Sequence, residues 1–174
     1  ADFTGNYVGF FSDFVAYGKL ATHLGELNAD VNVKSPNDTL QYTGNIETRQ
    51  FALGTMLGDE NTLGNFAFNL NVDGLGTALE NLSVKAKGEV SKAELLGYCY
   101  SNVEVDGTLS DQVFNGNVYM NDSNARLDFN GLVNFGTEIP QIDCKSNIER
   151  LQLARLNLVP TDTHGVLSGK IDMK

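Results

Sequence analysis

Seven copies of one short motif recur along this chain of 174 residues, each with a glycine midway between two apolar or aromatic residues. An internal repeat constrains a fold strongly, because similar units must adopt similar structures. In every copy the glycine and both flanking residues share parity, so in a β-strand all three point to one face. Each copy therefore predicts a strand whose apolar face has no side chain at its centre. The central glycines are Gly5, Gly44, Gly88, Gly107, Gly116, Gly131 and Gly169.

The segments between these copies also have the patterns of strands and turns. Residues 27–33 and 65–72 alternate between apolar and polar side chains, as half-buried strands do. Short polar breaks at 110–112 and 121–124 are typical of hairpin turns. Residues 148–158 fit strands with a bulge better than a helix. We therefore expect one all-β unit over residues 1–174, with repetitive antiparallel strands and almost no helix.

The formal net charge of −10 excludes several classes of partner. A nucleic-acid surface and a polybasic membrane anchor both need clustered basic residues, so neither is expected. The sequence contains no run of about 20 apolar residues, which a membrane-spanning helix would need, and no signal-peptide pattern. Because motif copies reach almost to both ends of the sequence, we expect an internal segment of a longer repetitive protein.

No catalytic motif accompanies the two histidines, His23 and His164. Neither lies in a nucleophile-elbow sequence, and the polar run 121–124 lacks the spaced carboxylates of a calcium loop. We expect no enzyme activity, no cofactor and no metal site. If alternation is strict, Cys99 and Cys144 lie on the same strand face as their apolar neighbours, which predicts buried free thiols. The alternative is a single cross-strand disulfide between them.

The repeated glycines bear on whether the apolar face is closed or open. In an ordinary β-sandwich two such faces close on each other about 10 Å apart. A glycine within a strand often marks a bend, so seven at equivalent positions favour a sheet folded lengthwise into a U around an apolar groove. The seven glycines would then be the strand-bend positions. The groove would be lined by Leu27, Ala29, Val31, Val33, Phe66, Phe68, Leu70, Val72, Val103, Val105, Val118, Met120, Leu127, Phe129, Val133 and Phe135.

Several of these stretches resemble the TamB/AsmA-like superfamily of long periplasmic proteins, and TamB-type translocation and assembly modules in particular. The likeness lies in the glycine-centred strand repeats, in the pairs Leu24-Gly25-x-Leu27 and Leu63-Gly64-x-Phe66, and in the stretch from Phe114 to Gly131. It extends over most of the chain, although each motif alone carries little information.

The resemblance implies a U-shaped, taco-like β-sheet in a protein anchored in the inner membrane by a segment absent from this chain. It also implies a periplasmic location, phospholipid acyl chains as cargo, support of outer-membrane biogenesis, and an outer-membrane assembly partner of the BamA/TamA type. It offers no catalytic residue to carry over. Edge-to-edge self-association is a further expectation, because an open sheet exposes unpaired strand edges.

Three functions remain open on the sequence. The first is a non-enzymatic segment of a bridge that carries phospholipids between the two membranes. The second is a chaperone or scaffold for outer-membrane β-barrel or autotransporter assembly, by strand addition or by groove binding. The third is a closed β-sandwich adhesin or carbohydrate-binding module. For the third, Tyr98 and Tyr100 are the candidate platforms, since strict alternation places both on the polar face.

Overall fold

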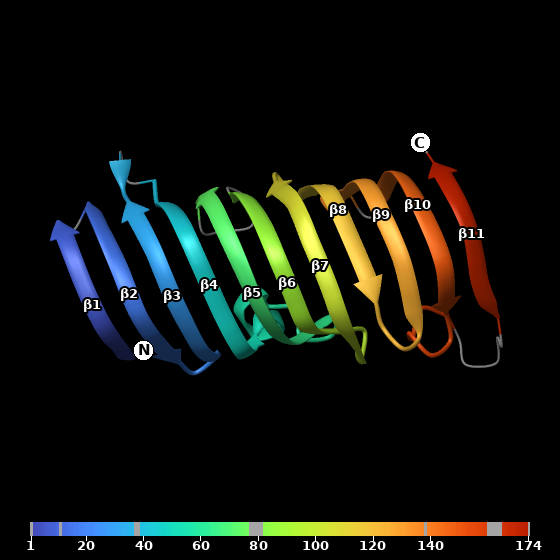
Figure 1. Cartoon of the computed structure of the whole chain (residues 1–174), viewed down its shortest axis with the longest axis horizontal. Helices are drawn as coiled ribbons and strands as arrows, with labels where there is room; N and C mark the ends of the chain where they lie inside the picture. The colour runs from blue at the N-terminus through green and yellow to red at the C-terminus, as the bar shows by residue number, and fades with distance from the viewer. Residues whose placement is uncertain are drawn as a thin grey trace.

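The computed structural model describes residues 2–10, 12–36, 39–76, 82–137, 139–159 and 165–173, and these form one antiparallel sheet. Each strand pairs with the strands before and after it in sequence, so the sheet follows chain order (Figure 1). The expected all-β, repetitive antiparallel fold is confirmed. The strands are β1 (Asp2–Phe10), β2 (Asp13–Thr22), β3 (Gly25–Lys34), β4 (Gln41–Ala52), β5 (Leu63–Leu75), β6 (Ser83–Leu95), β7 (Tyr98–Ser110), β8 (Val113–Asn121), β9 (Ala125–Asn134), β10 (Gln141–Gln152) and β11 (Val166–Met173).

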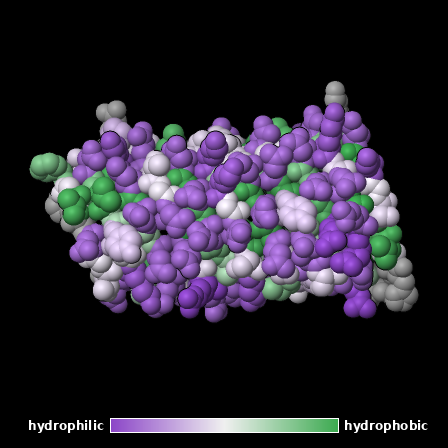
Figure 2. Space-filling model, in the orientation of Figure 1, coloured by the Kyte–Doolittle hydropathy of each residue, from purple (hydrophilic) through white to green (hydrophobic). Residues whose placement is uncertain are grey.

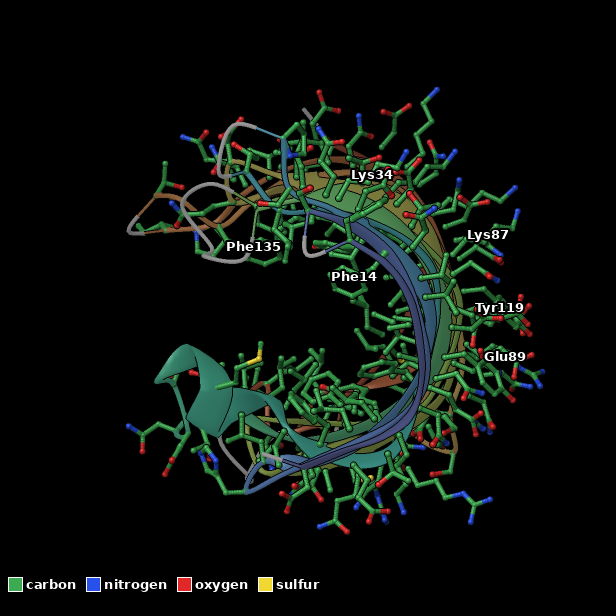
Figure 3. All side chains as sticks on the ribbon, turned by 90° about the vertical axis from the view of Figure 1, so that its left-hand side faces the viewer. Phe14, Lys34, Lys87, Glu89, Tyr119 and Phe135 are labelled. Carbon is green, nitrogen blue, oxygen red and sulfur yellow. The ribbon has the colours of Figure 1, made fainter. Side chains whose placement is uncertain are left out.

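The sheet curves strongly along its strands. Viewed from the β1 edge, the strands trace a C, which is the taco-like shape expected from the sequence (Figure 3). The space inside the C runs across the strands, so its length depends on how many strands the sheet has. The eleven strands of the described sheet, at a spacing of about 4.8 Å, give a trough of roughly 50 Å.

The side chains divide cleanly between the inside and the outside of the C. Phe14 on β2 points inward (Figure 3). Directly opposed residues of neighbouring strands share a face, and Phe14 lies opposite Val33, which lies opposite Tyr42. We call the inner surface the concave face and the outer surface the convex face. The residues labelled on the convex face in Figure 3 are Lys34, Lys87, Glu89 and Tyr119.

All seven motif glycines lie within strands and not in turns. At Gly88 the backbone φ is +150°, and a Cβ would lie 2.2 Å from the carbonyl oxygen of Asn69 on β5. Gly169 on the edge strand β11 has nearly the same φ, +151°, but a Cβ there would meet nothing within 4 Å. The position of Gly88 thus requires glycine for two separate reasons. The proposed role of the glycines in bending the strands stays a prediction.

Strands β6 and β7 exchange their inward and outward faces between the pairs Val90–Val103 and Lys92–Ser101. Asn102 on β7 has a positive φ of 52°, a conformation that asparagine tolerates better than most residues. Beyond it Tyr100 points inward and is only 6% exposed, and Tyr98 packs beside it. The expectation that these tyrosines are exposed on the polar face is therefore wrong, because alternation does not continue through residue 102.

The same reversal changes the position of one cysteine. Cys99 is exposed, so its predicted burial is wrong, whereas Cys144 on β10 is buried as predicted. Both are free thiols, which contradicts the alternative of a disulfide. Burial raises the pKa of the Cys144 thiol, with the nearby carboxylates Asp143 and Asp172 adding to the effect.

Non-strand segments extend one arm of the C. The helix α1 (Leu53–Leu57) lies at one lip of the C (Figure 3). The bulged strand expected at 148–158 is present up to Gln152, where β10 ends after a register shift between Ile148 and Leu151. Residues 153–159 form turns and bends, so no strand continues to residue 158. Leu156 in this segment is fully buried and belongs to a cluster with Ala93, Tyr100 and Ala125. Leu156 thus packs in the core from a turn segment and not from a strand.

Two sequence expectations fall outside the described residues. The sequence pattern predicts a helical turn at 77–79 and a last hairpin turn at 161–165, and these residues, apart from Gly165, lie outside the described part of the chain. The hairpin turns expected at 110–112 and 121–124 are confirmed, since β7 ends at Ser110 and β8 ends at Asn121.

Replacement of Gly88 by alanine should destabilise the fold much more than the same change at Gly169. Both variants place an L-residue at a strained φ, but only Gly88→Ala also forces a Cβ into a backbone carbonyl. We expect a loss of about 3 kcal/mol or more at Gly88 and about 1 kcal/mol at Gly169, by urea unfolding. Equal losses would show that φ alone, and not close strand approach, makes glycine necessary.

Glu94 on β6 closes an irregularity in the neighbouring strand. The register of β5 shifts between Leu63 and Phe66, which leaves the backbone N–H of Asn65 without a ladder partner. That N–H donates to Oε2 of Glu94 at 2.8 Å, and the Asn65 side-chain amide donates to the same oxygen at 3.1 Å. The hydrogen bond from Lys92, followed by those from Asn65, lowers the pKa of Glu94 from 4.5 to about 2.

This lowered pKa makes part of the stability dependent on pH. Because the folded pKa lies below the unfolded value of 4.5, the contribution is complete above that pH and disappears as the pH falls towards 2. Glu94→Gln should therefore lower the unfolding free energy at pH 7 by about 1–2 kcal/mol, a figure reduced for solvent screening. Urea unfolding at pH 7 and near pH 2 checks this. A difference between wild type and variant that persists at the lower pH would contradict it.

Candidate ligand-binding groove

The concave face consists of parallel rows of side chains that cross the strands. Because directly opposed residues share a face, each row can be followed from strand to strand through the register. The row nearest the lip opposite α1, which we call the rim row, is Phe14, Val33, Tyr42, Gly74, Val84, Leu109, Phe114, Val133 and Ile142. The row at the back of the trough, the central row, is Gly18, Ala29, Ile46, Leu70, Gly88, Val105, Val118, Phe129, Ser146 and Ile171.

Fifteen of the sixteen predicted lining residues lie in strands on this face. Fourteen are half-buried and Val33 is buried, whereas Phe135 follows β9 and is 56% exposed at the lip (Figure 3). A closed sandwich would bury such residues almost completely. Their partial exposure, together with the single open sheet, contradicts the closed-sandwich alternative. That the residues contact a ligand stays a prediction.

The trough is not equally open along both arms. Leu156 and Ala125 are fully buried on the arm that carries α1, with Phe66, Val90 and Leu95 packed around their cluster. This part of the concave face is occupied by the protein's own side chains. The rim row and the central row therefore provide most of the open apolar surface.

A buried carboxylate holds the hairpin beside this packed arm. Asp122 between β8 and β9 is 3% exposed and accepts hydrogen bonds from Tyr98 at 2.5 Å and from the Ser101 hydroxyl at 2.7 Å. Burial raises its pKa, but the hydrogen bonds from Tyr98, Asn124 and Ser101 outweigh burial and keep the pKa below its ordinary value. Asp122 is thus charged and fully engaged, which makes it a structural residue.

The convex face is hydrophilic over most of its area (Figure 2). Exposed ion pairs cross it, such as Lys87 with Asp106 at 2.7 Å, and so do amide pairs such as Asn130 with Asn117 at 2.6 Å. Isolated surface ion pairs contribute little stability. The main effect of this polar coat is to leave the concave face as the principal apolar surface.

One part of the convex face departs from this pattern. A hydrophobic patch lies over β1 and β2, at the left-hand end of Figure 2. Its aliphatic members Val8 and Val15 are directly opposed and are 70% and 42% exposed, while Phe10 is 81% exposed and Tyr17 63%. We call these four residues the convex patch. Because both faces expose apolar side chains, an experiment on an apolar ligand must show which face the ligand occupies.

The described part of the chain contains no candidate metal site that would compete with the groove. No group of three or more metal-ligating side chains occurs among them. His23 is exposed in the turn between β2 and β3, and His164 lies outside the described part of the chain. No helix in the described ranges is long and apolar enough to cross a membrane.

Sequence reasoning missed part of the groove. Phe14, Tyr42, Val84, Leu109 and Phe114 belong to the rim row, yet only Val33 and Val133 of that row were predicted. Phe14, for example, lies opposite Val33, which was predicted to line the groove. Only the pairing of the strands shows that the two side chains share a face. The sequence therefore contained these apolar residues, but without the strand register it did not show that they line the groove.

Comparison of the chain with protein-family models, with curated proteins and with solved structures finds no match. The resemblance to the TamB/AsmA-like superfamily accordingly stays an expectation, and the site must be interpreted from its own geometry.

An open groove should bind a neutral apolar dye, whereas a closed core would exclude it. Fluorescence titration of the purified chain checks this, with the double variant Val8→Thr/Phe10→Thr as the control that removes much of the convex patch. We expect the double variant to retain most of the binding. Loss of binding in that variant would place the dye on the convex patch, and no binding to either protein would contradict an open groove.

Proposed function

We propose that the concave face binds the acyl chains of phospholipids, and that the chain is a non-enzymatic segment of a bridge carrying lipids between two membranes. One observation carries the proposal: a half-buried apolar face crosses strands β2 to β10 and faces a trough open along its length. A trough of this kind suits a long, flexible apolar ligand better than a compact one.

The binding energy of an acyl chain should depend little on its exact position along the groove. Removal of apolar surface from water contributes about 25 cal/mol per Å² and does not depend on direction. In the central row Val105, Val118 and Phe129 offer similar partly exposed surfaces on successive strands. An acyl chain that moves by one strand spacing therefore exchanges one apolar contact for another. Movement along the groove should meet only small barriers.

The composition of the two faces supports the same assignment. The concave face is aliphatic and aromatic, while the convex face carries polar and charged side chains that keep the segment in water. A location between two membranes, in a periplasm, and an outer-membrane assembly partner of the BamA/TamA type are parts of the proposal that rest on the resemblance alone.

A chaperone for outer-membrane β-strands is the second candidate, and the edge strands favour it. Strands β1 and β11 each pair on one side within the described sheet. Their other edges carry backbone groups able to accept an added strand. Such binding would use the edges and leave the central row free, so the site of capture distinguishes the two functions.

A photo-crosslinking amino acid at Phe68 or Phe129 should capture phospholipid. These positions point into the trough, and their sequence neighbours Asn69 and Asp128 point outward on the same strands. The experiment uses the purified chain with phosphatidylcholine vesicles, irradiation, and mass spectrometry of the adducts.

The outward positions are matched controls, because they share strand, depth and probe chemistry with the inward ones. We expect adducts at Phe68 and Phe129 and few at Asn69 and Asp128. Equal capture at inward and outward positions, or capture at outward positions only, would refute the lipid groove. Capture of unfolded β-barrel peptides by probes on β1 or β11, with no lipid adducts, would favour the chaperone.

A further inference from the structure

The concave face contains a small number of hydroxyl groups among its apolar side chains. Nearly all of those described donate to a partner within the protein. Thr48 donates to the carbonyl of Glu26 at 2.7 Å, Ser146 to the carbonyl of Asp128 at 2.8 Å, and Tyr100 to the carbonyl of Leu156 at 3.4 Å. Thr22 and Tyr98 are engaged in the same way. These hydroxyls are therefore occupied by the fold.

Tyr42 is the exception among the described hydroxyls of this face. It lies second in β4, in the rim row, between Val33 on β3 and Gly74 on β5. A Cβ at Gly74 would lie 2.9 Å from Cε2, Cζ and Oη of Tyr42, so the ring lies flat over the glycine backbone. The absence of a side chain at Gly74 makes room for the ring. The hydroxyl itself has no hydrogen-bond partner within the described protein.

The neighbours of this hydroxyl are apolar. Val33 is buried beside it, and Val84 follows Gly74 in the rim row. Partial burial raises the pKa of Tyr42, so the group is protonated and able to donate at neutral pH. The hydroxyl oxygen is not among the buried atoms that lack a partner, so it remains accessible to water. A ligand that displaces this water leaves the donor unpaired, at a cost in free energy, unless the ligand offers an acceptor.

We propose that Tyr42 marks the position of the ester group of a lipid in the groove, its hydroxyl donating a hydrogen bond to the ester carbonyl. The inference rests on the proposed function and specifies its ligand: an ester-linked lipid with the ester at the rim row and the acyl chain along the central row. Tyr42 acts as a specificity-determining residue and takes part in no reaction.

The balance of donors and acceptors favours an ester lipid over a polypeptide in this groove. An ester presents acceptors and no donor. An extended polypeptide presents an N–H at nearly every residue, and each would need an acceptor in the trough. The other described hydroxyls of the face are engaged, and the backbone of the inner strands is paired in the sheet. One free tyrosine suits one ester carbonyl and leaves most of a peptide backbone unsatisfied.

The position along β4 agrees with this orientation of the lipid. Tyr42 is close to the end of its strand, near the lip, while the central row is deeper in the trough. A lipid whose ester lies at Tyr42 would place its acyl chain against the central row and direct its polar headgroup towards water. The headgroup then requires no polar site inside the groove.

The test compares two short-chain phosphatidylcholines that differ only in linkage, one with two ester bonds and one with two ether bonds. Each displaces a groove-bound neutral apolar dye from the wild-type chain and from Tyr42→Phe. The hydrogen bond should make wild type favour the ester lipid by about three- to tenfold. Tyr42→Phe should lose this preference and bind the ether lipid as wild type does.

Two further variants complete the design. Tyr119→Phe makes the same chemical change on the convex face and should retain the ester preference. Gly74→Ala keeps the Tyr42 hydroxyl but displaces its ring, so it should reduce the preference. Thermal unfolding shows whether each variant remains folded.

The outcomes separate this inference from the function on which it rests. Equal affinity of wild type for both lipids, or an ester preference that survives Tyr42→Phe, would overturn the role of Tyr42 and leave the lipid groove in place. Failure of both lipids to displace the dye would overturn the lipid groove and the inference together.

Discussion

The structure depends on the alternation of apolar and polar side chains along antiparallel strands that pair in chain order. Each hairpin places the apolar residues of one strand opposite those of the next, as Val105 opposite Val118 and Val118 opposite Phe129. Repeated across eleven strands, this pairing gathers the apolar side chains on one face of a single sheet. A flat sheet would leave that face in water, and the observed curvature covers part of it.

Local irregularities explain why the two arms of the C differ. On the arm carrying α1, the register shift in β4 and the reversal at Asn102 bring Phe51 and Tyr100 inward, on the same face as Phe66. Leu156 packs with Tyr100 in the buried cluster, Phe66 packs against that cluster, and Glu94 accepts a hydrogen bond from the Asn65 amide beside the register shift in β5. Among the described residues, the opposite arm, with its regular rim row, has no such buried cluster. The open part of the trough is therefore the regular part of the sheet.

The division of polar groups between the two faces bears on function. On the convex face they pair with one another across strands, as Lys87 does with Asp106, and face water. On the concave face the described hydroxyls bond back to the fold except at Tyr42. A surface with much apolar area and one free donor is suited to selecting an amphipathic ligand with few polar atoms.

The sequence alone determined the fold class, because period-two alternation and hairpin turns are local signals that each strand carries for itself. It also identified inward residues such as Leu70, Val118 and Phe129, where alternation is unbroken. Tertiary structure decided what happens at interruptions: the faces of Cys99 and Tyr100 depend on the left-handed backbone at Asn102, and burial of Leu156 depends on residues far away in the chain. The strand register likewise decided that Tyr42 lies over Gly74, because these two residues are far apart in sequence and meet only through the pairing of β4 with β5.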